Sequence, residues 1–224
     1  MLLRPWGVYG PQGDSFLLRE ALLRASVPPG ARMLDVGTGT GLLALTAARL
    51  GACEVWAVDA SYRAVLAARC NVRLSRLPVP VHVEHGDFRT LLVGRRFDVV
   101  TANPPYVPAP EDTTGEPRKT RAWNAGPEGR LYLDPLCAMA PGLLTPGGTM
   151  LLVHSSLAQP ARTLRLLADA GLVVSVVARR DQPFGPVLTT RAGWLEERGL
   201  IGPGQREEEL VVIRADRPPA PGRP

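Results

Sequence analysis

The chain has 224 residues, of which 45% are hydrophobic and 21% are charged, which is typical of one globular domain with a substantial core. Its net charge of +5 is compatible with an acidic or nucleic-acid partner but does not establish one. No apolar run reaches the ~20 residues that span a bilayer, and Cys53, Cys70 and Cys137 form no Cys-x-x-Cys pair. We therefore expect a cytoplasmic protein with reduced thiols, no metal site and no membrane segment.

Strand and helix patterns alternate along the chain. The first helix is expected over residues 14–26, with Asp14 or Ser15 as its N-cap. Further helices are predicted over residues 41–50, 62–76, 131–144 and 160–171. Strands are predicted over residues 32–37, 53–59, 79–87, 96–103, 148–155, 172–180 and 208–215.

The alternation of strands and helices indicates βαβ units around a parallel sheet. No clear helix separates the last two strands, so we expect them to pair antiparallel. The prediction is an α/β fold with a mostly parallel seven-stranded sheet, an antiparallel last strand and helices on both faces. One domain is expected over residues 1–215, followed by a disordered proline-rich tail over 216–224.

Two segments depart from the alternation of strands and helices, and the first of them, residues 107–130, has no periodic apolar spacing. Residues 107–130 form a loop long enough to be functional or disordered. Residues 183–205 lie between the last two strands, where the stretch "RAGWLEERGL" is a candidate short helix.

A glycine turn follows the first predicted strand in the stretch "LDVGTGTG". Gly37 and Gly39 allow a tight turn and a close approach to a ligand. The dinucleotide fingerprint G-x-G-x-x-G would require a glycine at Leu42, so the spacing argues against a bound pyrophosphate. Asp35 just before the turn would repel phosphate and attract a cation.

Carboxylates also end the next two strands. Asp59 is placed to accept both hydroxyls of a ribose. Asp87 could accept from an adenine amino group, and Phe88 could pack on the ring. Each carboxylate alone is commonly a cap or turn residue, but with Asp35 they describe a pocket for a cationic nucleoside.

The fourth strand ends in the stretch "NPPY". Pro104 and Pro105 cannot extend a ladder, and the first restricts Asn103 to extended geometry. Asn103 is therefore expected at the carboxyl edge of the sheet, where open α/β sheets bind their ligands. Tyr106 adds an aromatic ring to this edge.

This constellation resembles the class I S-adenosylmethionine (SAM)-dependent methyltransferases, among which NPPY marks enzymes that methylate the amino group of a base or the amide of glutamine. The stretch "VYGPQGDSFLL" resembles the "VYEPAEDTFLL" pattern of the HemK-like protein-glutamine methyltransferases, in the branch that modifies archaeal and eukaryotic release factors. "RAWNAGPEGRLYLD" resembles a loop of the same branch. The chain departs from the family at Gln12 or Gly13, where the family has glutamate, and residues 183–205 are longer than the family pattern.

The resemblance implies a Rossmann-like class I methyltransferase fold and SAM as cofactor. It assigns cofactor contacts to Ser15, Asp35, Gly37, Gly39, Asp59, Asp87, Phe88 and Asn103. Substrate contacts would come from Asn103, Pro104, Pro105, Tyr106 and Trp123, with Asn103, Pro104 and Tyr106 catalytic. The oxygen of Asn103 and the carbonyl of Pro104 would accept the two hydrogens of the methylated nitrogen, and Tyr106 would stack on its planar group.

The first hypothesis is therefore methylation of a protein glutamine, in a release factor with a Gly-Gly-Gln motif. The alternatives are an amino methyltransferase acting on RNA or DNA bases and a SAM-binding protein without catalysis. Low aromatic content and interspersed charges favour a protein acceptor. Arg118, Lys119 and Arg121 could steer an acidic partner or could simply form a solvated loop. Relatives in this branch use a small zinc-binding activator subunit, and "VPVHVEHG" in the third strand is apolar enough to pair with one.

Overall fold

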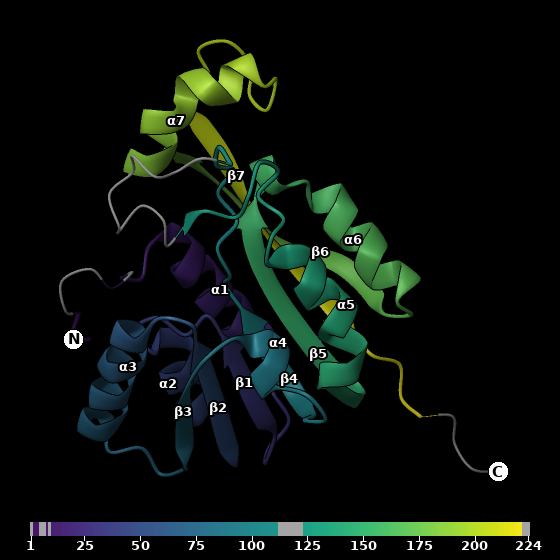
Figure 1. Ribbon diagram of the computed structural model, residues 1–224. Helices are drawn as coiled ribbons and strands as arrows, with labels where there is room; N and C mark the ends of the chain where they lie inside the picture. The colour runs from purple at the N-terminus through teal and green to yellow at the C-terminus, as the bar shows by residue number, and fades with distance from the viewer. Residues whose placement is uncertain (1, 5–7, 9, 112–122, 221–224) are drawn as a thin grey trace.

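The computed structural model describes residues 2–4, 8, 10–111 and 123–220. Seven strands form one sheet in the order β3-β2-β1-β4-β5-β7-β6 (Figure 1). The strands are β1 (Arg32–Val36), β2 (Glu54–Asp59), β3 (Val81–His85), β4 (Phe97–Ala102), β5 (Leu144–Ser155), β6 (Val173–Pro183) and β7 (Glu207–Asp216). The helices are α1 (Gly13–Arg24), α2 (Leu42–Arg49), α3 (Tyr62–Ser75), α4 (Phe88–Leu91), α5 (Leu133–Leu143), α6 (Pro160–Asp169) and α7 (Pro186–Glu197).

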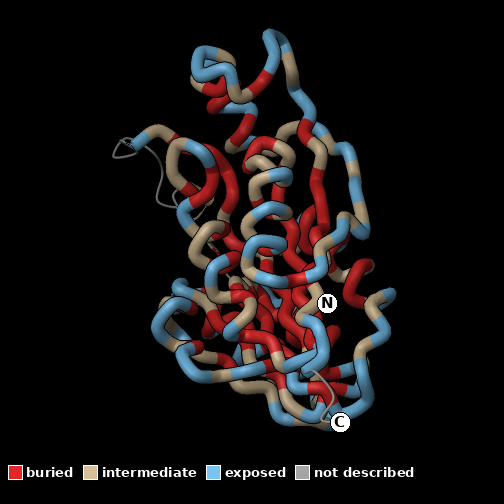
Figure 2. Tube along the Cα trace, turned by 90° about the vertical axis from the view of Figure 1, so that its right-hand side faces the viewer, coloured by how far each residue is buried: buried red, intermediate tan, exposed pale blue. Residues whose placement is uncertain are grey.

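The predicted sheet is confirmed. Strand β7 runs antiparallel to both β5 and β6, and the other neighbouring strands are parallel. Helices α1, α2 and α3 cover one face, and α4, α5 and α6 cover the other (Figure 1). Because helices cover both faces, most residues of the central strands are buried, and buried stretches are red in Figure 2. None of the helices in the described residues is long and apolar enough to cross a membrane.

Several boundaries differ from the sequence prediction. The N-cap of α1 is Gln12, so Asp14 and Ser15 lie in the first turn of the helix, where both are buried. Helix α7 is a full helix between β6 and β7, where only a short one was expected. Strand β7 includes Asp216, the first residue of the expected tail. Arg217 donates from its guanidinium to the backbone oxygens of Pro141 and Leu144, so the chain is still attached to the domain there.

Candidate active site at the carboxyl edge of the sheet

The carboxyl ends of β1, β2 and β4 meet at a cavity of about 400 Å³, a volume within the range of small-molecule sites. It brings together most of the residues that the sequence singled out. Those that line it are Gly37, Gly39, Asp59, Asp87, Phe88, Asn103, Pro104, Pro105, Tyr106 and Trp123. Two predicted residues do not: Asp35 lies below the turn, and Ser15 lines a small adjoining hollow that it shares with Asn103.

The turn after β1 brings two backbone segments very close together. Gly37 has a φ of +73°, and a Cβ added there would lie 2.9 Å from the backbone oxygen of Asn103. The Gly37 and Thr38 N–H groups both donate to the oxygen of Val58 at the end of β2. Only glycine satisfies both the conformation and the spacing, so the turn forms a flat wall of backbone beside Asn103.

Asp59 ends β2 and links the glycine turn to the start of α3. Its Oδ2 accepts from the Gly39 N–H at 2.9 Å, and its Oδ1 accepts from the Ser61 N–H at 2.8 Å. Burial raises the pKa of Asp59, and these two bonds oppose that shift. Because each carboxylate oxygen can accept more than one hydrogen bond, Asp59 can still accept hydroxyl groups of a ligand in the cavity.

Asp35 holds the turn from below. Its side chain is buried, with Oδ2 accepting from the Thr38 hydroxyl at 2.7 Å and from the Ala44 N–H at 3.2 Å. Its Oδ1 accepts from the Thr101 hydroxyl at 3.0 Å. Burial raises the pKa of Asp35 to about 6. These bonds show that Asp35 fixes the turn and the start of α2; its attraction of a cationic ligand stays a prediction.

Asp87 and Phe88 form the far wall of the cavity. Asp87 is the N-cap of α4, accepts from the Arg89 N–H at 2.9 Å and pairs with the Arg89 guanidinium. Bonding to Arg89 lowers the pKa of Asp87. Asp87, which was expected to accept from an adenine amino group, is thus paired with Arg89. Arg89 also lines the cavity, and the sequence did not single it out.

Asn103 is fixed by a cluster of polar side chains from the first turn of α1. Its Nδ2 donates to Asp14 Oδ2 at 3.2 Å and to Ser15 Oγ at 3.3 Å. The Tyr106 hydroxyl donates to the same Asp14 oxygen at 3.1 Å. Because the amide nitrogen is directed toward α1, the oxygen is the end of the Asn103 side chain that can accept from a ligand.

Asp14 was expected only as a helix cap, and it is the residue that the sequence reasoning most clearly missed. The signal was present in the stretch "GDSFLL", where an acid next to a serine opens the helix. Its contacts, however, are with Asn103 and Tyr106, which lie 89 and 92 positions further along the chain. Nothing local in the sequence indicates such a pairing.

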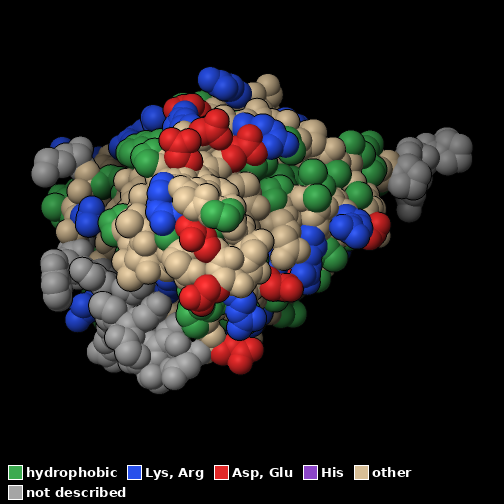
Figure 3. All heavy atoms as spheres, turned by 90° about the horizontal axis from the view of Figure 1, so that it is seen from above, with side chains coloured by type: hydrophobic (Ala, Val, Ile, Leu, Met, Phe, Trp, Pro, Cys, Tyr) green, Lys and Arg blue, Asp and Glu red, His purple; other side chains and the backbone are tan. Residues whose placement is uncertain are grey.

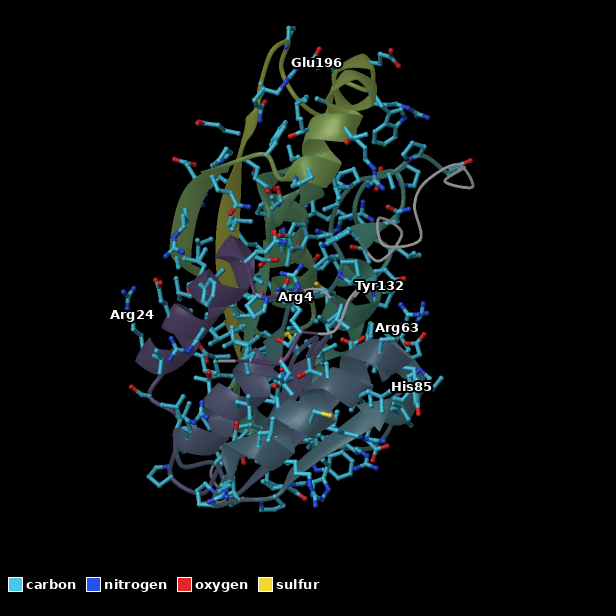
Figure 4. The ribbon with its side chains drawn as sticks, turned by 90° about the vertical axis from the view of Figure 1, so that its left-hand side faces the viewer. Arg4, Arg24, Arg63, His85, Tyr132 and Glu196 are labelled. Carbon is cyan, nitrogen blue, oxygen red and sulfur yellow. The ribbon has the colours of Figure 1, made fainter. Side chains whose placement is uncertain are left out.

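The loop after "NPPY" contributes the outer wall. Val107 and Trp123, one in each described part of this loop, both line the cavity. Tyr132, just before α5 and labelled in Figure 4, lines it as well. A bridge joins Val107 to Asn124. The basic residues Arg118, Lys119 and Arg121, expected to steer an acidic partner, lie outside the described residues.

Comparison with known proteins gives consistent matches. The family of ribosomal protein L11 methyltransferases (PrmA) matches residues 20–104. A Methanocaldococcus jannaschii protein, whose name places it among the protein N5-glutamine methyltransferases, is 32% identical over 83% of this chain and 91% of its own length. The methyltransferase HEMK2 of Mus musculus is 32% identical over 74% of this chain and 79% of its own. The release factor glutamine methyltransferases of Gloeobacter violaceus and Moorella thermoacetica are 34% and 37% identical, but the chain spans only about half of their length.

Solved structures share the fold. The structure described as the E. cuniculi Mtq2-Trm112 complex, responsible for methylation of the termination factor eRF1, matches with a TM-score of 0.65 and 21% identity, over 94% of this chain and 99% of that one. A Thermus thermophilus 16S rRNA N2 G1207 methyltransferase, described in complex with AdoMet and guanosine, matches with a TM-score of 0.57 and 22% identity, over 93% of this chain and 44% of that one.

A seven-stranded sheet of this order, with a glycine turn and strand-end carboxylates around one cavity, defines a class I SAM-dependent methyltransferase. Within that class, the chain belongs to the family of protein N5-glutamine methyltransferases.

Proposed function

We propose that this methyltransferase transfers a methyl group from SAM to the side-chain amide nitrogen of a glutamine in a protein, namely the glutamine of a Gly-Gly-Gln motif in a translation release factor. The observation that carries the proposal is the orientation of Asn103. Its amide nitrogen is held by Asp14 and Ser15 at the cavity wall, which leaves its oxygen to accept from another primary amide.

The residues present fit SAM as cofactor. The glycine turn exposes backbone to the cavity, because a side chain at Gly37 would clash with the backbone of Asn103. Next to this turn, the Asp59 carboxylate can accept from ribose hydroxyls. Phe88 supplies an apolar surface for the adenine ring, with Asp87 next to it. When bound, SAM supplies an electrophilic methyl group on a sulfonium. Asp59, Gly37, Gly39, Asp87 and Phe88 are the residues that would hold it.

The work left to the protein is orientation of the acceptor. An amide nitrogen is a poor nucleophile because its lone pair is delocalised into the carbonyl. If Asn103 Oδ1 and the Pro104 carbonyl accept its two hydrogens, the nitrogen is held with its lone pair directed at the methyl group. Tyr106 packs against the planar amide. Preorganised acceptors and correct placement of this kind need neither a metal nor a strong base.

A protein acceptor fits the surface better than a nucleic acid. On the face seen from the α7 end, arginines and acidic side chains are interspersed rather than gathered into a basic stripe (Figure 3). Aromatic residues make up 5% of the chain. Nucleic-acid binding usually combines a continuous basic groove with stacking aromatics.

We further propose that a small zinc-binding activator subunit pairs with the edge of the sheet at β3. Within the described residues β3 has a strand neighbour on one side only, β2. The helix next to it, α3, exposes Tyr62 and Leu66. An unpaired edge beside apolar side chains can be extended by a strand of another protein, and the Mtq2 relative is described in complex with Trm112.

The acceptor is tested by incubating the purified chain, with and without a candidate activator subunit, with methyl-labelled SAM. Separate reactions contain a release factor, total RNA or DNA. The proposal predicts label in the release factor, and loss of that label when the Gly-Gly-Gln glutamine is replaced by glutamate. Label confined to nuclease-sensitive material would overturn it and support methylation of a base.

A further inference from the structure

Helix α7 lies in the segment between β6 and β7, at the top of Figure 1. Its buried face contains Leu188, Ala192 and Leu195, as expected for a helix on a core. The same face also contains Arg191, which is only 5% exposed. A buried arginine needs fixed acceptors, because an unpaired buried charge is very costly.

Two acceptors of Arg191 come from the two described parts of the loop that follows "NPPY", residues 107–111 and 123–130. One guanidinium nitrogen donates to the backbone oxygen of Pro108 at 3.0 Å. The other terminal nitrogen donates to the side-chain oxygen of Asn124. The planar fork of arginine can serve two acceptors at once in a fixed relative position.

Each of these acceptors directly follows a residue of the cavity wall. Pro108 follows Val107, and Asn124 follows Trp123; Val107 and Trp123 both line the cavity. The two described parts of the loop are also joined by backbone bonds, from the Ala125 N–H to the oxygen of Val107 at 3.1 Å and from the Ala109 N–H to the oxygen of Gly126 at 3.0 Å. Arg191 therefore closes this ladder from the side of α7.

We propose that Arg191 is a positioning residue for the methyl acceptor. Because it joins Pro108 to Asn124, it fixes the distance between Val107 and Trp123. That distance sets the width of the opening through which a glutamine side chain enters. This inference rests on the proposed function for the identity of the acceptor. The residues proposed for SAM end or follow β1, β2 and β3, whereas Pro108 and Asn124 lie in the loop after β4. Loss of Arg191 is therefore expected to affect the acceptor side of the cavity.

The kinetic test uses Arg191→Met, which keeps the apolar stem of the side chain, and Arg191→Lys, which keeps the charge but cannot replace the fork. Both variants are expected to raise the KM for the acceptor about tenfold or more, with kcat changed less than about threefold, as loss of ground-state positioning does. The dissociation constant for SAM stays within about twofold of wild type by calorimetry. Arg206→Met is the matched control, because Arg206 pairs with Glu196 at the C-terminal end of α7 and is half exposed.

A second variant addresses the contact from the loop side. Asn124→Ala removes the side-chain acceptor and leaves α7 unchanged. If Arg191 and Asn124 act together, the double variant Arg191→Met/Asn124→Ala raises KM by clearly less than the product of the two single effects. Multiplicative effects would mean that the two residues act independently and would overturn the proposal.

Hydrogen exchange provides a readout that needs no acceptor. The amides of Ala109 and Ala125 are expected to exchange faster in Arg191→Met and Arg191→Lys than in wild type or Arg206→Met. Unchanged exchange would overturn the inference. Faster exchange with unchanged acceptor KM would retain the contact but reject its role in positioning. If wild type methylates nucleic acid instead of a release factor, the proposed function fails, and the KM comparison is made with that acceptor.

Discussion

Substitution of Asp14 is predicted to lower the rate of methyl transfer, although Asp14 lies outside the "NPPY" stretch. One oxygen of its buried carboxylate accepts from both Asn103 and Tyr106, and the other accepts from the N–H and hydroxyl of Ser15. In Asp14→Asn the side chain keeps its shape but has one acceptor oxygen instead of two. If that oxygen faces Ser15, the new NH₂ group faces two donors, Asn103 and Tyr106.

The size of the effect follows from the bonds that are lost. A hydrogen bond to a charged group contributes about 1.5–3 kcal/mol. If roughly one such bond is needed to keep the Asn103 oxygen directed at the acceptor, the corresponding loss in kcat is about ten- to a hundredfold. The Tyr106→Phe variant removes one of the two donors, so its effect through Asp14 is expected to be smaller.

The assay is single-turnover methyl transfer at saturating SAM and acceptor, with SAM affinity measured in parallel. Asp98→Asn is the matched control, because Asp98 also accepts two hydrogen bonds, from the Arg32 N–H and the Thr145 hydroxyl, at the opposite end of β4. It is expected to change stability without changing the transfer rate. A transfer rate of Asp14→Asn equal to that of wild type would refute the reasoning, as would an additive loss when it is combined with Asn103→Ala.

Two further variants test the cofactor pocket and the buried histidine. Asp59→Ala is expected to weaken SAM binding by about 1.5–3 kcal/mol, since it removes a charge-assisted bond to the ribose hydroxyls; unchanged affinity by calorimetry would mean that the pocket is misplaced. His154 on β5 is fully buried, and burial lowers its pKa from 6.5 to about 4. The unfolded chain therefore binds this proton more readily, so wild type should lose roughly 2–3 kcal/mol relative to His154→Leu as the pH falls from about 6.5 to about 4. Urea unfolding at both pH values measures this difference, and parallel pH profiles of the two proteins would contradict it.

The positions of site residues at the ends of strands could be predicted from the sequence. Asp59, Gly37 and Asn103 each end or follow a strand of a βαβ unit, and parallel strands place their carboxyl ends at the same edge. The pattern of strands and helices is therefore enough to predict that these three residues lie close together.

Residues that depend on distant partners were not predictable. The buried side chain of Asp35 accepts from Thr101, which lies 66 positions away, and this contact could not be foreseen from the residues around Asp35. Asp14 has the residue type of an N-cap, yet Gln12 takes that position. Helix α7 was expected only in part: it begins at Pro186, ahead of the stretch "RAGWLEERGL", because a proline can occupy the first turn of a helix.

The most direct test of the central claim, that Asn103 orients a primary amide for methylation, is the single-turnover rate of methyl transfer to the release-factor glutamine by Asn103→Ala. We expect SAM affinity within about threefold of wild type and a rate lower by at least about a hundredfold, as loss of a preorganised transition-state hydrogen bond produces. A rate within about tenfold of wild type, at the same SAM occupancy, would remove Asn103 from this role and contradict the account.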